Sequence, residues 1–215
     1  MGNSRCRGRR RVLAKDMGDR YAARMNAAAV STPYITVEEY LADELLSEVK
    51  REYLGGVVYA MAGASEAHNI IAMSLTGMLY AQLRGKPCQA FGSDMKVRLR
   101  PLDSTYFYYP DAMIACDPTD SGHGWRERPA ALFEIISEEN RRVDEREKRV
   151  PYLQLPSLQY YLRIEQTQAE VVLDRRTPDG WKSERLTGLD AVVQLEALGI
   201  ELPLAELYER VTFLG

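Results

Sequence analysis

Residues 130–137 (AALFEIIS) form an almost unbroken apolar run with one acidic residue, Glu134, at its centre. Such a run predicts a strand covered on both faces, because a half-exposed strand alternates apolar and polar residues. A second run, residues 106–116 (YFYYPDAMIAC), is interrupted by Pro110 and Asp111. Proline cannot donate to a β-ladder, so a bend or bulge is expected there, and a bulge can re-aim the Asp111 side chain toward a site.

The remaining segments alternate between helical and strand patterns. Helices are predicted over 37–48, 66–84 and 144–155, with a short one near 204–211. Strands are predicted in the remaining segments: a hairpin turning at Gly55-Gly56, then 89–99, 158–165, 169–176 and a short strand from Trp181. The order predicts an α/β fold. A central mixed β-sheet is flanked by helices, with an N-terminal helix-hairpin and a C-terminal β extension.

The chain has 215 residues, which fits one domain with additions, placed at residues 31–215. Residues 1–30 are assigned to a basic leader. Residues 1–24 hold eight Lys and Arg against two acids, so the rest of the chain carries a net charge of −9. The leader is interpreted as a disordered or over-annotated extension, and the alternative is a nucleic-acid-binding arm. The acidic body argues against tight non-specific DNA binding.

The cysteine content and the hydropathy of the sequence indicate in which cellular compartment the protein is expected. Cys6, Cys88 and Cys116 are far apart and odd in number, and with two histidines they do not suggest a structural zinc site. This usage predicts a reducing, cytoplasmic location. No stretch approaches the length of apolar residues needed to span a membrane, so no membrane partner is expected.

Glu134 and Asp111 are the candidate chemical groups. A buried carboxylate is costly unless it meets a metal ion, a cation or a strong hydrogen-bond donor. Two carboxylates from neighbouring strands suit a hard cation such as Mg²⁺ or Mn²⁺, and a nearby lysine suits phosphodiester hydrolysis. The same pattern also fits carboxylates that are exposed or salt-bridged, and the residues alone leave both readings open.

A wider set of motifs carries a family resemblance. They are Arg51-Glu52-Tyr53-Leu54 with Gly56, Val58, Tyr59, Met61 and Gly63, then His68, Phe91-Gly92-Ser93-Asp94-Met95-Lys96-Val97, Tyr109-Pro110-Asp111, Glu134-Ile135-Ile136-Ser137, Asp144 with Lys148, and Pro156-Ser157-Leu158 with Tyr161. Over residues 34–212 this set of motifs resembles that of the Uma-type family of putative restriction endonucleases, within the PD-(D/E)xK group. The resemblance implies a restriction-endonuclease-like core and a metal-dependent nuclease acting on DNA.

The resemblance also implies roles for individual residues. Asp111 and Glu134 correspond to metal-binding carboxylates and Lys148 to a catalytic lysine that has moved to the following helix, since Ile136 stands where the usual lysine would be. Tyr152 lies one helical turn beyond Lys148, and Glu52 matches an acidic position that completes the site. Pro151 departs from the family pattern. A proline here can kink the helix just beyond Lys148, so the sequence leaves open whether the lysine reaches the catalytic position.

Three further residues are candidates for nucleic-acid contacts: Lys96, Arg98 and His68. Lys96 and Arg98 share one face of the predicted strand 89–99, and the alternative for them is a solvated surface. His68 begins the predicted helix 66–84, and the alternative is a half-buried structural histidine. The sequence therefore predicts a Mg²⁺- or Mn²⁺-dependent endonuclease that cleaves DNA and forms a homodimer. The competing hypothesis is an inactive nuclease-fold protein that serves as an interaction module.

Overall fold

The structure is a computed structural model that describes residues 34–61, 63–101, 104–120, 124–137 and 147–213. The elements belong to the unit Ile35–Gly215. The predicted leader and the predicted helix start at Asp144 lie outside the described residues. In chain order the elements are α2 (Val37–Glu44), β1 (Arg51–Leu54), β2 (Val57–Ala60), α3 (Glu66–Leu83), β3 (Gln89–Gly92), β4 (Lys96–Leu99), β5 (Tyr106–Tyr108), β6 (Ala112–Ala115), β7 (Trp125–Arg126), β8 (Pro129–Ile136), α4 (Arg149–Leu153), β9 (Tyr160–Glu165), β10 (Glu170–Thr177), β11 (Gly180–Thr187), β12 (Val192–Leu195), η3 (Glu196–Leu198), β13 (Ile200–Pro203) and α5 (Leu204–Leu207).

The strands of the described residues form a six-stranded sheet (β11-β10-β9-β8-β6-β3), a five-stranded sheet (β2-β1-β5-β4-β7) and the hairpin β12-β13. In the larger sheet β8 and β9 run parallel, whereas β6 and β8 run antiparallel. The sheet is therefore mixed, as predicted. The predicted α/β class, the N-terminal helix-hairpin and the C-terminal β extension are all present.

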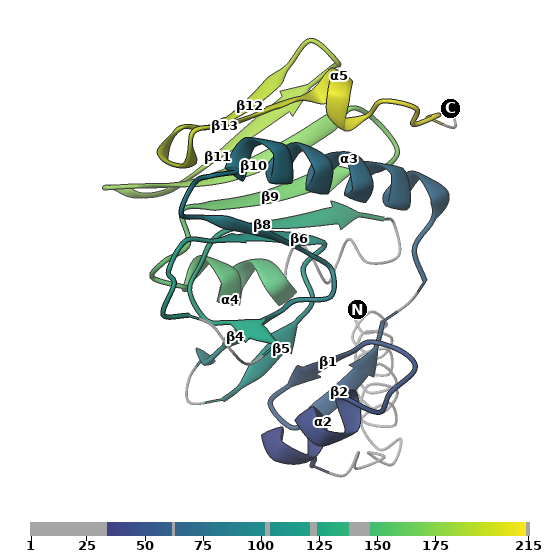
Figure 1. The fold of residues 1–215 in the computed structure, drawn as a ribbon, viewed down its shortest axis with the longest axis vertical. Coiled ribbons are helices and arrows are strands. Elements are labelled where there is room, and N and C mark those ends of the chain that lie inside the picture. The colour runs from purple at the N-terminus through teal and green to yellow at the C-terminus, as the bar shows by residue number, and fades with distance from the viewer. Residues whose placement is uncertain (1–33, 62, 102–103, 121–123, 138–146, 214–215) are drawn as a thin grey trace, which may run out of the picture. The chain divides into compact units, whose positions relative to one another are not determined.

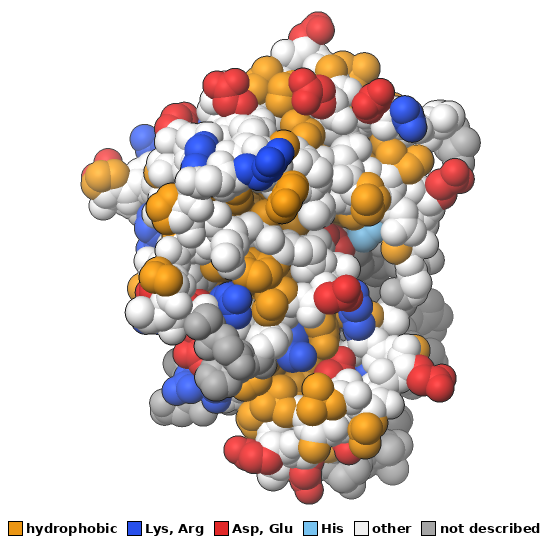
Figure 2. All heavy atoms as spheres, viewed as in Figure 1, with side chains coloured by type: hydrophobic (Ala, Val, Ile, Leu, Met, Phe, Trp, Pro, Cys, Tyr) orange, Lys and Arg blue, Asp and Glu red, His pale blue; other side chains and the backbone are white. Residues whose placement is uncertain are grey.

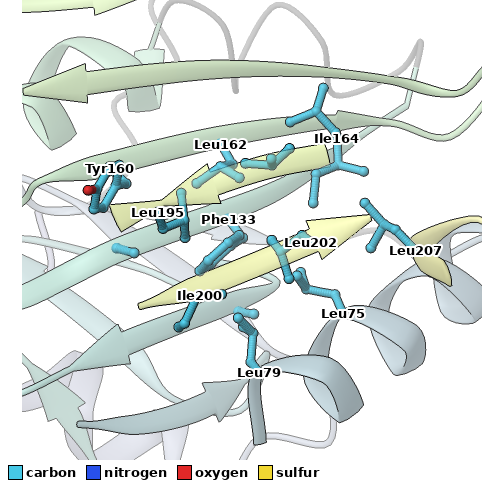
Figure 3. Close-up of a cluster of buried hydrophobic side chains, with 14 of the residues drawn as sticks. Leu75, Leu79, Phe133, Tyr160, Leu162, Ile164, Leu195, Ile200, Leu202 and Leu207 are labelled. Carbon is cyan, nitrogen blue, oxygen red and sulfur yellow. The ribbon is translucent and has the colours of Figure 1, made fainter. Parts of the chain in front are cut away.

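Strand β8 lies near the middle of the larger sheet and is buried along its whole length. Its side chains alternate between the two faces, as a period of two requires. Phe133 and Ile135 pack with Leu75 and Leu79 of α3 and with the β12-β13 hairpin, as Figure 3 shows for Phe133, Leu75 and Leu79. Leu132 packs on the opposite face with Tyr152 of α4. Figure 1 shows α3 and α4 on opposite sides of this sheet.

Local sequence signals explain several of the element ends. Thr36 and Glu39 form the predicted capping box at the start of α2, and Ser65 caps α3 by accepting a hydrogen bond from the His68 amide. The β1-β2 turn has positive φ angles at both Gly55 and Gly56, a conformation that a two-residue hairpin turn favours and that glycine adopts easily. Helix α2 ends four residues before the predicted end at 48.

Two predicted strands are each split in two, with the halves in different sheets. The prediction of one strand over 89–99 is wrong, because a turn at Gly92–Met95 separates β3 from β4, and the Met95 amide donates to the Gly92 carbonyl at 3.2 Å. The predicted strand 106–116 likewise divides into β5 and β6. Here the break falls at Tyr109-Pro110-Asp111, where a bend was expected because Pro110 lacks an amide donor.

Cys88 and Cys116 form a disulfide, which the sequence interpretation did not foresee. The β3-β6 register pairs Gln89 with Ala115, so the two cysteines are the next residues along an antiparallel pair. Their separation of 28 residues in the sequence hides this neighbourhood, because strand pairing and not chain distance brings them together.

Candidate active site

Glu134 is a buried carboxylate on the α4 side of strand β8, with 3% of its surface exposed. Its Oε1 accepts a hydrogen bond from the Tyr152 hydroxyl at 2.9 Å. The Lys148 Nζ lies 3.4 Å from Oε1 and 3.5 Å from Oε2. The acid in the apolar run therefore has both a cation and a hydroxyl donor as partners, which is what its burial requires.

Asp111 immediately precedes β6, in the position that the break at Pro110 creates. The β6-β8 register pairs Ala112 with Phe133, so Asp111 and Glu134 come next on the two strands. The Asp111 Oδ2 accepts a hydrogen bond from the Ile135 amide at 2.6 Å. Its Oδ1 lies 3.1 Å from His68 Nε2, at the start of α3. These two contacts set the orientation of the Asp111 carboxylate beside β8.

The Lys148 ammonium joins the two sheets. Its Nζ lies 3.1 Å from Glu52 Oε1, on β1 of the five-stranded sheet, and it contacts Glu134 on β8 of the six-stranded sheet. It also lies 5.6 Å from the centre of the Tyr108 ring. Only 7% of the Lys148 side chain is exposed. The kink that Pro151 could cause does not turn Lys148 away, because Lys148 precedes α4 and its ammonium lies between the two glutamates.

Glu52 is 8% exposed on the short strand β1, which pairs with β5. Its Oε1 also accepts a hydrogen bond from the Tyr109 amide at 3.1 Å. Tyr109 immediately precedes Pro110. The interruption between β5 and β6 that positions Asp111 therefore also positions the Tyr109 amide as a donor to Glu52. Of the five residues predicted from the family resemblance, Glu52, Glu134, Lys148 and Tyr152 thus contact one another in one cluster. Asp111 pairs with His68 and adjoins this cluster through the amide of Ile135, the residue after Glu134.

Two tyrosines of the cluster are held in their neutral form. Burial, and then the Glu134 and Glu52 carboxylates, raise the pKa of Tyr152 well above its ordinary value of 10.0. Burial and the Glu52 carboxylate also raise the pKa of Tyr108, with the Lys148 ammonium opposing them. The Tyr152 hydroxyl therefore stays protonated at neutral pH and remains a hydrogen-bond donor to Glu134.

Lys96 and Arg98 lie on β4 of the five-stranded sheet, and their contacts described below are with residues other than Asp111 and Glu134. Lys96 Nζ donates to the Tyr109 hydroxyl at 3.2 Å, and burial lowers the pKa of this lysine. The Arg98 guanidinium pairs with Glu127 at 3.2 Å and lies 5.7 and 5.8 Å from the rings of Phe107 and Trp125. On the face shown in Figure 2, basic and acidic side chains of the described residues are interspersed.

Asp174 on β10 is a buried acid that the sequence interpretation missed, fully enclosed and paired with Arg149 at 2.7 Å. The signal was available, because Asp174 follows the apolar run Val171–Leu173 in the same way that Glu134 interrupts its own run. Arg149 directly follows Lys148, so this ion pair connects β10 to the segment that carries the catalytic candidate.

The described residues contain no group of three or more His, Cys, Asp or Glu side chains arranged to hold a metal ion. Asp111 and Glu134 nevertheless supply the hard oxygen donors that Mg²⁺ prefers, and Mg²⁺ needs only one or two carboxylates, because waters and phosphate oxygens complete its shell. The chemistry of this donor pair therefore fits Mg²⁺ or Mn²⁺. Soft sulfur ligands are absent from the cluster as described, since Cys88 and Cys116 are joined in the disulfide.

Similar proteins were found in both sequence and structure comparisons. Two Synechocystis proteins (strain ATCC 27184 / PCC 6803 / Kazusa) match over most of their lengths: slr1290 is 28% identical and covers 84% of this chain and 95% of its own, and sll1609 is 29% identical with 79% and 97% covered. A crystal structure from Anabaena variabilis ATCC 29413, titled as a putative nuclease belonging to DUF820, superposes with a TM-score of 0.65 at 16% identity, covering 83% of this chain and 99% of that one. At this identity the match establishes the fold.

In the part of the chain that the structure describes, no helix combines the length and the apolar character needed to cross a membrane.

The sequence model of the Uma2 family, described as "Putative restriction endonuclease", matches residues 37–205. This match includes every residue of the cluster, from Glu52 to Tyr152, and most of the chain. The protein therefore belongs to the Uma2 family and has the mixed α/β fold of a nuclease-like relative.

Proposed function

We propose that the protein is a metal-dependent nuclease that hydrolyses phosphodiester bonds of DNA. The observation that carries the proposal is the Lys148 ammonium, which is buried between Glu52 and Glu134. The oriented carboxylate of Asp111 adjoins Glu134 in the β6-β8 register. Ionisable groups taken from separate strands and enclosed together are typical of catalytic sites, because such burial is unfavourable for stability alone. Membership of the Uma2 family supports the same reaction class.

In this proposal Asp111 and Glu134 hold Mg²⁺ or Mn²⁺, and a bound ion supplies Lewis-acid chemistry at the phosphodiester. The chain's own groups orient this site. The Ile135 amide and His68 fix Asp111, and the Tyr152 hydroxyl fixes Glu134. Lys148 places a positive charge beside Glu134, where it orients the attacking water and offsets negative charge on the phosphate.

The test is a cleavage assay on plasmid DNA with Mg²⁺ or Mn²⁺, using the native protein, Asp111→Ala, Glu134→Ala and Lys148→Met. The three substitutions are expected to lower cleavage by about a hundredfold or more, because each removes a group that acts in the transition state. The matched control is Glu184→Gln, which removes an exposed carboxylate on β11 and should leave cleavage unchanged. Equal cleavage by all variants would mean that another site or a contaminant is responsible.

A specific observation also supports the competing function, a non-enzymatic interaction module. Ile136 stands where a PD-(D/E)xK lysine is usual, and Lys148 is satisfied by ion pairs within the chain. If this alternative holds, no metal-dependent cleavage occurs and Asp111→Ala leaves the unfolding free energy unchanged or raised, because it removes one of two neighbouring like charges. A melting temperature that rises with Mg²⁺ in the native protein but not in Asp111→Ala would contradict it.

A homodimer also remains part of the proposal, because two-fold symmetry is the commonest arrangement of soluble oligomers and would present two active sites to two DNA strands. Sedimentation equilibrium of the native protein tests this directly. A mass equal to one chain at all concentrations used for cleavage would exclude the dimer.

A further inference from the structure

Asp174 is enclosed on the same side of the larger sheet as Glu134, and its side chain has no exposed surface. Arg149 binds it with two hydrogen bonds, from Nε to Oδ2 at 2.9 Å and from Nη2 to Oδ1 at 2.7 Å. Arg163 adds a third at 3.1 Å, and the Ser183 hydroxyl donates a fourth. A two-pronged arginine–carboxylate pair fixes both distance and orientation, so Asp174 sets the position of Arg149 closely.

Helix α4 needs such external contacts. It has five residues, contains Pro151, and has no side-chain hydrogen bond at its N-cap. A helix this short is not stable by itself. Its end is held from the sheet, since Arg176 donates to the Leu155 carbonyl at 2.7 Å and Trp181 Nε1 donates to the Leu153 carbonyl at 3.0 Å. The Arg149–Asp174 pair is the corresponding contact at its beginning.

Lys148 is the residue before Arg149, and its ammonium must reach Glu52 and Glu134 together. We propose that Asp174 is a positioning residue that acts on Lys148 through Arg149. Asp174 fixes the first residue of α4, and this fixes the backbone from which the Lys148 side chain extends. A displacement of about 1 Å at a catalytic group can cost about a hundredfold in rate. The catalytic part of this inference rests on the proposed nuclease function, whereas the positional part does not.

The experiment measures the accessibility of Lys148 separately from cleavage. Native protein, Asp174→Asn and Arg149→Met are treated briefly with an amine-acylating reagent, and modification of Lys148 is measured by peptide mass spectrometry. Cleavage of plasmid DNA with Mg²⁺ is measured in parallel. Arg149 is 30% exposed whereas Asp174 is fully enclosed, so Arg149→Met is expected to disturb folding less and serves as the second variant. The matched control is Glu196→Gln, which removes the Arg175–Glu196 pair on the other side of the same strand.

Modification of Lys148 is expected to rise severalfold in Asp174→Asn and Arg149→Met and to stay at the native level in Glu196→Gln. In the same two variants kcat should fall by about tenfold or more with little change in KM. Asp174→Asn should add no further loss to Lys148→Met, because both act through one group.

Unchanged Lys148 modification in both variants would overturn the positioning role, whatever the cleavage rates. A rise in modification that also occurs in Glu196→Gln would overturn it too, since it would reflect general loosening. If the native protein cleaves nothing while Lys148 modification rises only in Asp174→Asn and Arg149→Met, the positioning role stands and the nuclease proposal fails.

Discussion

Lys148 is enclosed by two glutamates that come from different sheets, Glu52 on β1 and Glu134 on β8. Each of the three side chains would be unfavourable in this position without the others, because an unpaired buried charge loses its hydration. Their energies are therefore coupled, and removing one of them changes the effect of removing the next.

Replacing Lys148 with Met is expected to lower the unfolding free energy by about 3 kcal/mol, because it leaves two enclosed carboxylates without their cation. Adding Glu52→Gln should recover about 1 kcal/mol or more of this loss, since one of those charges is then removed. Urea unfolding of the two single variants and the double variant measures the coupling. Additive effects would mean that the two side chains do not interact in solution.

Tyr152 tests the hydrogen bond to Glu134 separately from packing. In Tyr152→Phe the ring still contacts Tyr108 and Tyr161, whose centroids lie at 5.6 and 5.4 Å, but the 2.9 Å bond to Glu134 is lost. We expect an unfolding free energy lower by about 1–3 kcal/mol, because a buried charged acceptor loses a donor. Tyr80→Phe, on the exposed side of α3, is the control and should change nothing measurable.

At the scale of elements, α4 shows how side chains from two neighbouring strands can define a helix that its own sequence barely supports. Proline and the short length disfavour α4, whereas contacts from Asp174, Arg176 and Trp181 on β10 and β11 favour it. The helix was predicted from its pattern, but its attachment to β10 depends on Asp174, which lies 25 positions from Arg149.

The Asp174 ion pair predicts a pH dependence of stability. Burial raises the pKa of this carboxyl, but the hydrogen bonds from Arg149 and Ser183 and the charges of Arg163 and Arg149 outweigh it, so the net pKa lies below the ordinary 3.8. A carboxyl with a lowered pKa stabilises the folded state fully above pH 3.8, and this contribution disappears as the pH falls through the folded-state pKa.

Asp174→Asn should therefore be less stable than the native protein by about 2–4 kcal/mol near neutral pH, because it leaves Arg149 and Arg163 without their counter-charge. The difference should shrink steadily once the pH is below 3.8. Urea unfolding at several pH values measures it. A difference that stays constant down to the lowest pH would show that the charge of Asp174 is not what stabilises the fold.

The ends of the helices and strands show which local sequence signals were sufficient to predict them. The capping residues Thr36 and Ser65 and the Gly55-Gly56 turn act within a few residues, so the starts of α2 and α3 and the first hairpin were predicted correctly. The split of 89–99 into two strands was not. Its alternating pattern continues through the turn at Gly92–Met95, and only the pairing partners of β3 and β4 distinguish one long strand from two.

At the scale of the whole molecule, the Cys88–Cys116 disulfide joins the edge strand β3 to β6, which leads directly back to Asp111. A crosslink that spans 28 residues restricts the unfolded chain. Reduction is expected to lower the unfolding free energy by about 3 kcal/mol on this account.

The measurement compares urea unfolding with and without dithiothreitol for the native protein and Cys88→Ser. Reductant should destabilise the native protein and leave Cys88→Ser unaffected. The end of β6 nearest the site should remain folded in the reduced protein, because Ala112 and Met113 stay paired with β8. Equal unfolding curves for the oxidised and reduced native protein would show that the crosslink does not contribute.

Composition and local pattern were enough to establish the α/β class, the buried central strand and the two carboxylates that require partners. These are consequences of periodicity and of the cost of burying charge, which act on neighbouring residues. The family resemblance named Lys148 and Glu52 as site residues, but the contacts between the partners came from tertiary structure. Lys148 pairs with Glu52 across two sheets, Asp174 holds α4, and Cys88 meets Cys116, because strand pairing brings together residues that the chain keeps apart. The apolar surroundings of Glu134 in the sequence thus predicted that this carboxylate needs a partner. The tertiary structure brings Lys148 and Tyr152 to it, because the segment 148–153 packs against β8.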